Sequence, residues 1–197
     1  ISRLICGSNQ NDILTRFFNN GIMERKSVIA SFSPSMDIQV SSNFERLLYI
    51  INELDTAKVK KQMFDFKNEG KFEITKEQLL EINNLFAAYK ITDEETLDII
   101  KRVYEDYNYL LDPHSAIGYG ALLKAIDNKQ VEDNSIIVSL ACAHPAKFPS
   151  VISKSINSSP DVPIPLKKIM SSEEYFEVIN PNMSEIQSFI KSNMRSQ

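Results

Sequence analysis

Residues 3–21 read RLICGSNQNDILTRFFNNG and hold a strand pattern followed at once by a helix pattern. The short apolar run at 3–6 stops at Gly-Ser-Asn, which is typical of a buried strand that ends in a turn. An Asn-Asp pair at 11–12 then precedes a helix pattern over 13–19, which ends at an Asn-Gly pair as helices commonly do. This stretch therefore predicts a strand joined to a helix, the repeating unit of α/β proteins.

Two other segments have the pattern of short strands. They are SVIA at 27–30 and SIIVSL at 135–140, and the β-branched content of the second favours strand over helix. Three strands are too few for a doubly wound sheet, which usually has about five or six. We therefore expect an α/β fold that corresponds to the second half of a larger sheet.

The section between these strands has helical periodicity. Residues 43–107 predict three or four amphipathic helices, with capping boxes that begin at Thr75 and Thr92. Asp112-Pro113 predicts the start of another helix, roughly 113–126. Gly118 and Gly120 weaken that helix by about 1 kcal/mol each relative to alanine, so we expect a neighbour packed close against it.

Beyond residue 158 the sequence is looser and rich in proline. Two short helices are expected there, at about 171–178 and 184–194. The chain then divides into sheet and cofactor-side segments at 1–42 and 108–157, a helical insertion at 43–107 and C-terminal helices at 158–197. The loop at 31–42 (SFSPSMDIQVSS) is a candidate functional loop or a plain surface connection.

Composition excludes several classes of protein. The chain has 197 residues, is 43% apolar and 24% charged, and has no run of about 18 apolar residues, so we expect a globular protein without a transmembrane helix. Its start lacks a signal-peptide pattern and a methionine, which indicates a chain that begins within a longer protein. A net charge of −4 with scattered cations argues against nucleic-acid and membrane partners.

Few residues can ligate a metal or form a disulfide. Two cysteines make no disulfide framework and are expected to be buried thiols in the reducing cytoplasm, while two histidines argue against zinc. Among common motifs, those for dinucleotides, nucleoside triphosphates, serine hydrolases and zinc proteases are all missing. Because the chain has only five glycines, we expect no phosphate-cradling loop in it. No metal site is expected either.

One constellation remains, at the end of the predicted strand 135–140. Cys142, His144 and Lys147 lie within six residues there, and ligands of open α/β sheets bind at the carboxyl ends of strands. A Cys–His nucleophilic pair is one interpretation. The other is a packed cysteine with His144 and Lys147 at the surface, which the i, i+2 spacing favours.

Four blocks of the chain resemble threonine synthase, the pyridoxal-phosphate enzyme that makes threonine from O-phosphohomoserine. They are RLICGSNQNDILTRFFNNG (3–21), SFSPSMDIQVSSNFERLLY (31–49), YLLDPHSAIGYGAL (109–122) and ACAHPAKFPSVI (141–152). They occur in the order of that family at plausible spacing. The resemblance implies a partial three-layer sheet of the fold type II pyridoxal-phosphate enzymes with a helical insertion, incomplete without an N-terminal part.

The resemblance also implies the chemistry. The family converts O-phospho-L-homoserine and water to L-threonine and phosphate through pyridoxal-phosphate aldimines, with the cofactor as an electron sink. Its Schiff-base lysine and glycine-rich phosphate loop lie upstream of these blocks. No catalytic residue is therefore assigned in this chain, Lys147 is not the Schiff-base lysine, and the chain alone is expected to be inactive without the missing N-terminal part.

Cofactor-side residues follow from the same resemblance. In threonine synthases the pyridine nitrogen meets the hydroxyl of the Thr before Ala-His-Pro, and this chain has Cys142 at that position, where a thiol bonds more weakly. Ser33, Met36 and Asp37 are expected around the cofactor. The substrate-side candidates are Asn9, Asn11, Asp12, His144 and Lys147. Asp112 and His114 are expected to position the close-packed helix.

Two alternatives to the enzyme remain from the sequence. The Cys142 departure allows a non-catalytic threonine-synthase-like protein that binds a ligand or partner, and the Cys–His spacing allows a hydrolase. A half sheet would leave an edge and apolar helix faces exposed, so self-association is also expected.

Overall fold

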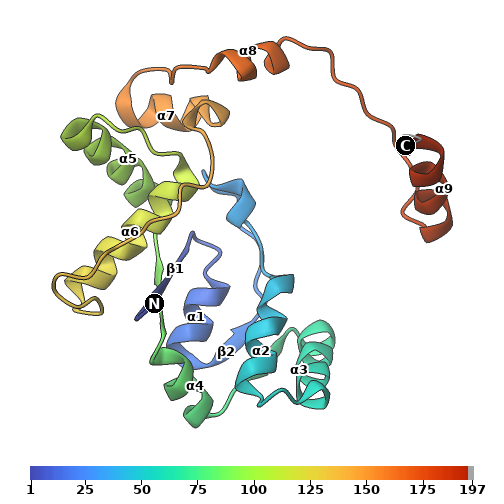
Figure 1. Cartoon of the computed structure of the whole chain (residues 1–197). Coiled ribbons are helices and arrows are strands. Elements are labelled where there is room, and N and C mark those ends of the chain that lie inside the picture. The colour runs from blue at the N-terminus through green and yellow to red at the C-terminus, as the bar shows by residue number, and fades with distance from the viewer. Residues whose placement is uncertain (195–197) are drawn as a thin grey trace. The chain divides into compact units, whose positions relative to one another are not determined.

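The computed structural model describes residues 1–194, and it places the first 161 of them in one compact unit while Val162 begins a second. Figure 1 shows the elements of both units. The strands are β1 (Leu4–Ser8), β2 (Ile22–Glu24), β3 (Lys71–Glu73) and β4 (Phe86–Lys90). The helices of the first unit are α1 (Ile13–Asn20), α2 (Glu45–Ile51), α3 (Thr56–Glu69), α4 (Lys76–Asn83), α5 (Asp93–Tyr107), α6 (Pro113–Asp127) and α7 (Pro149–Ile156). The second unit contains α8 (Ile164–Met170) and α9 (Met183–Asn193).

The strand and helix expected at 3–21 are both present. β1 pairs in parallel with β4, from Leu4 opposite Phe86 to Ser8 opposite Lys90, so the strand continues through the residues expected to turn. α1 ends at Gly21, which has φ +75° and whose N–H bonds to Phe17 O. The short strands β2 and β3 form a separate antiparallel pair.

The β1–β4 pair separates two hydrophobic cores. On one side, α1 and the β2–β3 pair enclose a cluster rich in aromatic rings, in which Phe17 is fully buried and meets Phe44 edge to face at 4.7 Å. On the other side, α5, α6 and α7 pack around Ile100, Ile117 and Ile152, all fully buried. This three-layer arrangement agrees with the α/β fold expected from the sequence.

Glycine permits the close approach of α6 to its neighbours. A Cβ on Gly7 of β1 would lie 3.0 Å from Ile117 O and 3.2 Å from the Ala121 methyl group. A Cβ on Gly120 would collide with the Ile99 side chain and lie 3.1 Å from the Ile91 terminal methyl. The close packing expected from the two helix glycines is therefore confirmed at Gly120.

Gly118 and Gly120 offer a matched pair of substitutions in one helix. Gly118→Ala meets only Ser139 Oγ at 3.8 Å, so we expect about 0.5–1 kcal/mol of added stability from helix propensity. Gly120→Ala must displace a buried isoleucine, and overpacking by about 1–3 kcal/mol outweighs the same gain. Urea unfolding of both variants measures the difference. Equal effects of the two substitutions would contradict the packing around Gly120.

Several expected elements differ in the structure. Residues 27–30 are not a strand, because both backbone polar groups of Ile29 bond to the Asn11 side chain at 2.8 Å instead of to another strand. Residues 135–140 are not a strand either, since no neighbouring strand pairs with them within the described chain, and Ile136 is 95% exposed. The section 43–107 is not purely helical, since β3 and β4 both lie within it.

The C-terminal helices also differ in part. No helix covers 171–178, because α8 occupies Ile164–Met170 and ends at Ser171. Proline is compatible with the first turn of a helix, so Pro165 lies in the first turn of α8 where the sequence suggests a connector. The helix expected at 184–194 is confirmed as α9, and its cap is Asn182, whose side chain accepts the Glu185 N–H at 2.9 Å. Within residues 1–194, no helix has the length and apolar character needed to span a membrane.

Candidate functional site

A buried polar network joins the end of β1 to the loop that follows residue 30. Asn9 is fully buried directly after β1, and its amide nitrogen lies 2.7 Å from Ser31 Oγ, 2.9 Å from Ser33 Oγ and 2.7 Å from Asp37 Oδ1. Its carbonyl oxygen accepts the Asn11 N–H at 2.8 Å. Because β1 is held by β4, this network fixes the loop on a rigid strand.

The carboxylate of Asp37 is the centre of that network. Its Oδ1 accepts from Asn9, from Asn11 Nδ2 at 2.9 Å and from Ser31 Oγ at 2.6 Å. Its Oδ2 accepts the Ser31 N–H at 2.9 Å. A carboxylate that accepts from four donors is held in place by hydrogen bonds, so Asp37 organises the loop.

A second buried network lies at the N-terminus of α6. Asp112 is 1% exposed and caps the helix, with Oδ1 accepting the His114 N–H at 2.9 Å and facing His114 Nδ1 at 3.0 Å. Its Oδ2 accepts the Ser115 hydroxyl and the Ala143 N–H, the latter at 3.2 Å. Ser115 Oγ in turn accepts the Cys142 N–H at 2.8 Å. The helix cap therefore also holds the segment that contains Cys142.

The two networks meet at His114. Its Nε2 accepts the backbone N–H of Ser35 at 3.3 Å, and Ser35 lies between Ser33 and Asp37 in the loop. An uninterrupted path of hydrogen bonds thus runs from Cys142 through Ser115, Asp112 and His114 to the loop. Residues more than 100 positions apart in the sequence are brought to one place.

The two thiols have different surroundings. Cys142 is exposed, and its Sγ approaches Leu140 O at 3.6 Å. Cys6 lies in β1 against the aromatic core, where burial raises the pKa of its thiol to about 11. The expectation of two buried thiols is therefore wrong for Cys142, which remains free to meet a ligand.

The other predicted site residues have separate surroundings. Asp12 forms ion pairs with Arg16 at 2.9 Å and Lys90 at 3.5 Å, while Met36 packs against the core between α5, α6 and α7. His144 Nδ1 accepts the Ala146 N–H at 3.1 Å and thereby caps a short turn. Lys147 is exposed.

The Cys–His nucleophilic pair is not formed. The imidazole of His144 bonds to the Ala146 backbone, and the thiol of Cys142 faces Leu140 O. Both partners of the proposed pair are therefore directed elsewhere, and the arrangement offers no base to the thiol. Among residues 1–194, no cluster of three or more His, Cys, Asp or Glu side chains could hold a metal ion.

Sequence reasoning missed three serines of the site. Ser31 and Ser35 lie in the loop singled out from the sequence, and Ser115 lies in the PHSA segment after the helix cap. The sequence does contain one indication of this hydrogen-bond network, because a capping Asp is followed three residues later by a Ser whose hydroxyl can reach it. Nothing in the sequence indicated that Ser115 would also bond to the backbone of Cys142.

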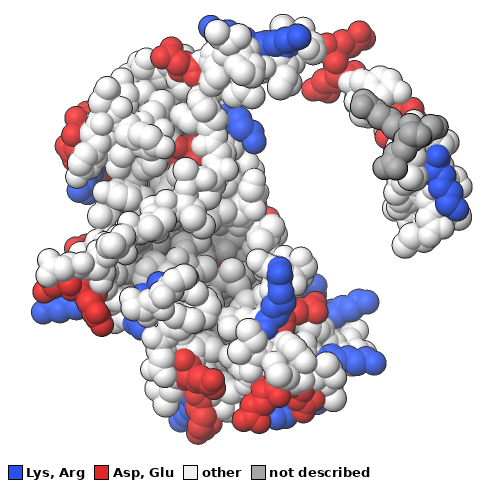
Figure 2. Space-filling model, in the orientation of Figure 1, with Lys and Arg blue, Asp and Glu red and all other residues white. Residues whose placement is uncertain are grey.

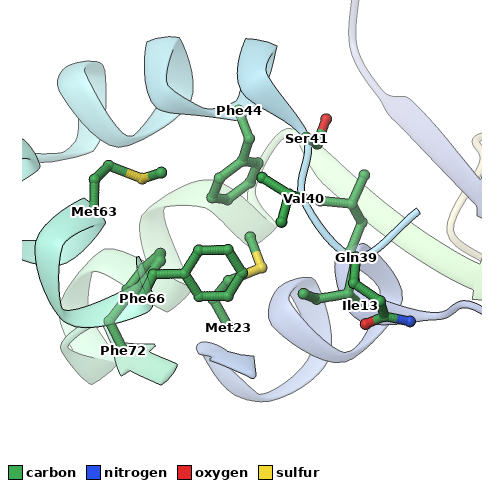
Figure 3. Close-up of a pocket in the computed structure, with 10 residues that line it drawn as sticks. Ile13, Met23, Gln39, Val40, Ser41, Phe44, Met63, Phe66 and Phe72 are labelled. Carbon is green, nitrogen blue, oxygen red and sulfur yellow. The ribbon is translucent and has the colours of Figure 1, made fainter. Parts of the chain in front are cut away.

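A separate apolar hollow lies within the aromatic core (Figure 3). Phe44, Met63 and Phe66 point into it from the helical section, and Met23 and Phe72 from β2 and β3. The remaining lining residues are Ile13, Leu14, Gln39, Val40 and Ser41. Because eight of these ten lining residues are apolar and only Gln39 and Ser41 are polar, with no charged side chain among them, we interpret the hollow as a packing feature of the core.

Charge does not single out one surface for a polyanion. On the face drawn in Figure 2, cationic and anionic side chains of the described residues are interspersed. Among the described residues, charged side chains also form ion pairs, such as Lys61 with Asp65 at 2.8 Å and Lys124 with Glu95 at 2.6 Å. Such pairs are typical of a solvated surface and leave the two buried networks as the candidate site.

Comparison with known proteins shows which family this chain resembles. A family model described as "Threonine synthase, C-terminal" matches residues 115–190. Threonine synthase of Pseudomonas aeruginosa is 36% identical over 191 residues, which is 96% of this chain and 40% of that protein. The resemblance predicted from four sequence blocks is therefore confirmed over nearly the whole chain.

Solved structures agree with the sequence comparison. The PLP-bound threonine synthase of Brucella melitensis superposes with a TM-score of 0.85 at 37% identity, covering all of this chain and 41% of that one. Yeast threonine synthase superposes with a TM-score of 0.80 at 31% identity, over 97% and 42% of the two chains. The fold class predicted from the sequence is thereby confirmed. The chain spans about 40% of the length of these relatives.

Proposed function

We propose that this chain forms one side of a pyridoxal-phosphate site. Its similarity to the C-terminal portion of threonine synthase, in sequence and in fold, supports the proposal. The whole enzyme would convert O-phosphohomoserine and water into threonine and phosphate. The observation that carries the proposal is the hydrogen-bonded path from Cys142 to Ser35, which joins Cys142 to the loop that contains the other predicted cofactor-side residues. A cytoplasmic location is part of the same proposal.

The surroundings of Cys142 fit the nitrogen side of a pyridine ring. The backbone on either side of its side chain is held, because Ser115 accepts the Cys142 N–H and Asp112 accepts the Ala143 N–H. The thiol itself is exposed. The held backbone fixes where the Cys142 side chain starts, and its exposed thiol is accessible to a ligand atom.

The residues of this chain would hold and orient the reactants. When bound, pyridoxal phosphate supplies an electron sink for substrate carbanions. Cys142 would contact the ring nitrogen, and the loop with Ser33, Met36 and Asp37 would close that side of the site. Asn9, Asn11 and Asp12 follow the carboxyl end of β1, where ligands of such sheets bind, and His144 and Lys147 would attract phosphate groups.

The chain by itself is expected to be inactive. The resemblance places the Schiff-base lysine and the glycine-rich phosphate loop in the N-terminal part of threonine synthases, which lies outside the matched segment. The proposed partners are therefore that N-terminal part and the small-molecule substrate. A non-catalytic ligand-binding protein is the alternative that the following experiment also tests.

A chimera tests the proposed function. This chain would replace the matching segment of Pseudomonas aeruginosa threonine synthase, and phosphate release from O-phosphohomoserine would be measured with added pyridoxal phosphate. We expect phosphate release by the chimera and none by the isolated chain. Cys142→Thr should tighten cofactor binding about fivefold, because a hydroxyl hydrogen bond is worth about 1 kcal/mol more than a weak thiol contact.

Matched outcomes separate the alternatives. Cys142→Ala serves as the control, and its cofactor affinity should fall below that of the cysteine form. A folded chimera that binds pyridoxal phosphate without releasing phosphate would refute the enzyme and favour the non-catalytic protein. Turnover by the isolated chain would instead refute its expected inactivity.

A further inference from the structure

His114 has an environment that its position in a helix does not explain. Its side chain is 8% exposed, and each ring nitrogen faces a different part of the protein. Nδ1 lies 3.0 Å from Asp112 Oδ1 at the helix cap, whereas Nε2 lies 3.3 Å from the backbone nitrogen of Ser35 in the loop. The imidazole is thus the direct polar connection between the two networks.

These contacts define where the imidazole carries its proton. A backbone N–H only donates, so Nε2 must accept from Ser35 and cannot carry a hydrogen. An ionised carboxylate only accepts, so Nδ1 must donate to Asp112. The arrangement therefore requires a neutral imidazole with its proton on Nδ1. The hydrogen bond that one ring nitrogen makes thus determines whether the other nitrogen carries a hydrogen.

The bond to Asp112 acts on the segment that contains Cys142. With Oδ1 held by His114, the carboxylate is oriented so that Oδ2 accepts the Ser115 hydroxyl and the Ala143 N–H. Ser115 can then accept the Cys142 N–H, since its own hydrogen is committed to Asp112. A change at His114 is therefore transmitted through two hydrogen bonds to the backbone beside the thiol.

We propose that His114 is a positioning residue. Through its ring, protonated on Nδ1, it fixes the position of the loop around Ser33 and Asp37 relative to the backbone of Cys142. The inference deepens the proposed function and rests on it for its catalytic meaning. The competing interpretation is that the ring only fills space against Phe148, whose centroid lies 5.0 Å away.

Two substitutions of similar size separate the roles of the two nitrogens. In His114→Asn the side-chain amide can reach the position of Nδ1 and donate to Asp112, but it loses the acceptor for Ser35. In His114→Gln the amide reaches the position of Nε2 and can accept from Ser35, but it loses the donor to Asp112. Both variants remove the aromatic contact with Phe148 equally.

Amide hydrogen exchange in the native chain provides the readout. His114→Asn should raise the exchange rate at Ser35 about five- to tenfold and leave Cys142 and Ala143 nearly unchanged, because one hydrogen bond is lost. His114→Gln should give the opposite pattern. Amides in α3, which is distant from His114 in the fold, would report any general loss of stability and serve as the internal reference.

The imidazole nitrogens of the unsubstituted chain give a measurement that needs no variant. Their NMR shifts should show a protonated Nδ1 and an unprotonated Nε2. The opposite tautomer, or identical exchange patterns in His114→Asn and His114→Gln, would overturn the proposal and leave only ring packing. Because both measurements use the isolated chain, they stand independently of phosphate release by the chimera, so failure of one is distinguishable from failure of the other.

Discussion

Replacing Asp112 by alanine should strongly destabilise this chain. The change removes an N-cap, worth about 1 kcal/mol, and also the acceptor for the buried Ser115 hydroxyl, the His114 ring and the Ala143 N–H. Each buried donor left without a partner costs about 1–3 kcal/mol. We expect a loss of about 4–5 kcal/mol in the free energy of unfolding, the lower end of that sum, measured by urea denaturation; this is a large part of typical domain stability.

Asp55 provides the control for the capping contribution. It caps α3 by accepting the Ala57 and Lys58 N–H groups at 2.8 and 3.1 Å, and it has none of the buried partners of Asp112. Asp55→Ala should therefore cost only about 1 kcal/mol. Equal losses from the two substitutions would show that the buried bonds of Asp112 contribute nothing beyond its cap.

A negative charge at Asn9 should destabilise the site in a pH-dependent way. The Asn9 amide nitrogen lies 2.7 Å from Asp37 Oδ1, so Asn9→Asp replaces a donor by a second carboxylate at a fully buried position. Two carboxylates at that separation cannot both ionise, and the pKa of one must rise. At neutral pH we expect a loss of about 3–5 kcal/mol, as for other unpaired buried charges.

The sign of the pH dependence follows from proton binding. The folded variant would hold a proton that the unfolded chain, with an aspartate pKa of about 3.9, has already released. Stability relative to the unsubstituted chain should thus fall as pH rises from about 4 toward 7, and recover on acidification.

Asn9→Ala is the control for this effect. It loses the same donors without adding charge, so its loss of stability should vary little with pH. Urea unfolding at several pH values compares them, and a pH-independent penalty for Asn9→Asp would place the new carboxylate away from Asp37.

Much of the site is accessible from local patterns and from the family resemblance. The amino-acid pattern alone points to the end of β1, the loop at 31–42 and the segment around Cys142, because polar residues after apolar runs mark strand ends and loops. The individual partners of these residues are not accessible in the same way. The resemblance predicts Asp12 on the substrate side of the site, but Arg16 and Lys90 hold it in ion pairs.

The errors in the fold have a common physical cause. A strand exists only when another strand satisfies its backbone groups, so residues 135–140 match the pattern of a strand yet remain unpaired within the described chain. The periodicity of 43–107 predicts three or four helices and no strand, yet Phe86–Lys90 forms a strand because it pairs in parallel with β1. Short apolar runs carry little information about which of the two structures they adopt.

The sequence alone was enough to determine the first strand and helix and the helices capped by Thr75, Thr92 and Asp112. It also indicated the close packing of α6. Each of these features depends on residues only a few positions apart. The meeting of His114 with Ser35, and of Ser115 with Cys142, depends on segments separated by 79 and 27 residues. Those groups come within hydrogen-bond distance only in the tertiary structure, where residues 33–37 and residues 142–143 both return to the N-terminus of α6, and no local pattern in the chain encodes that distance.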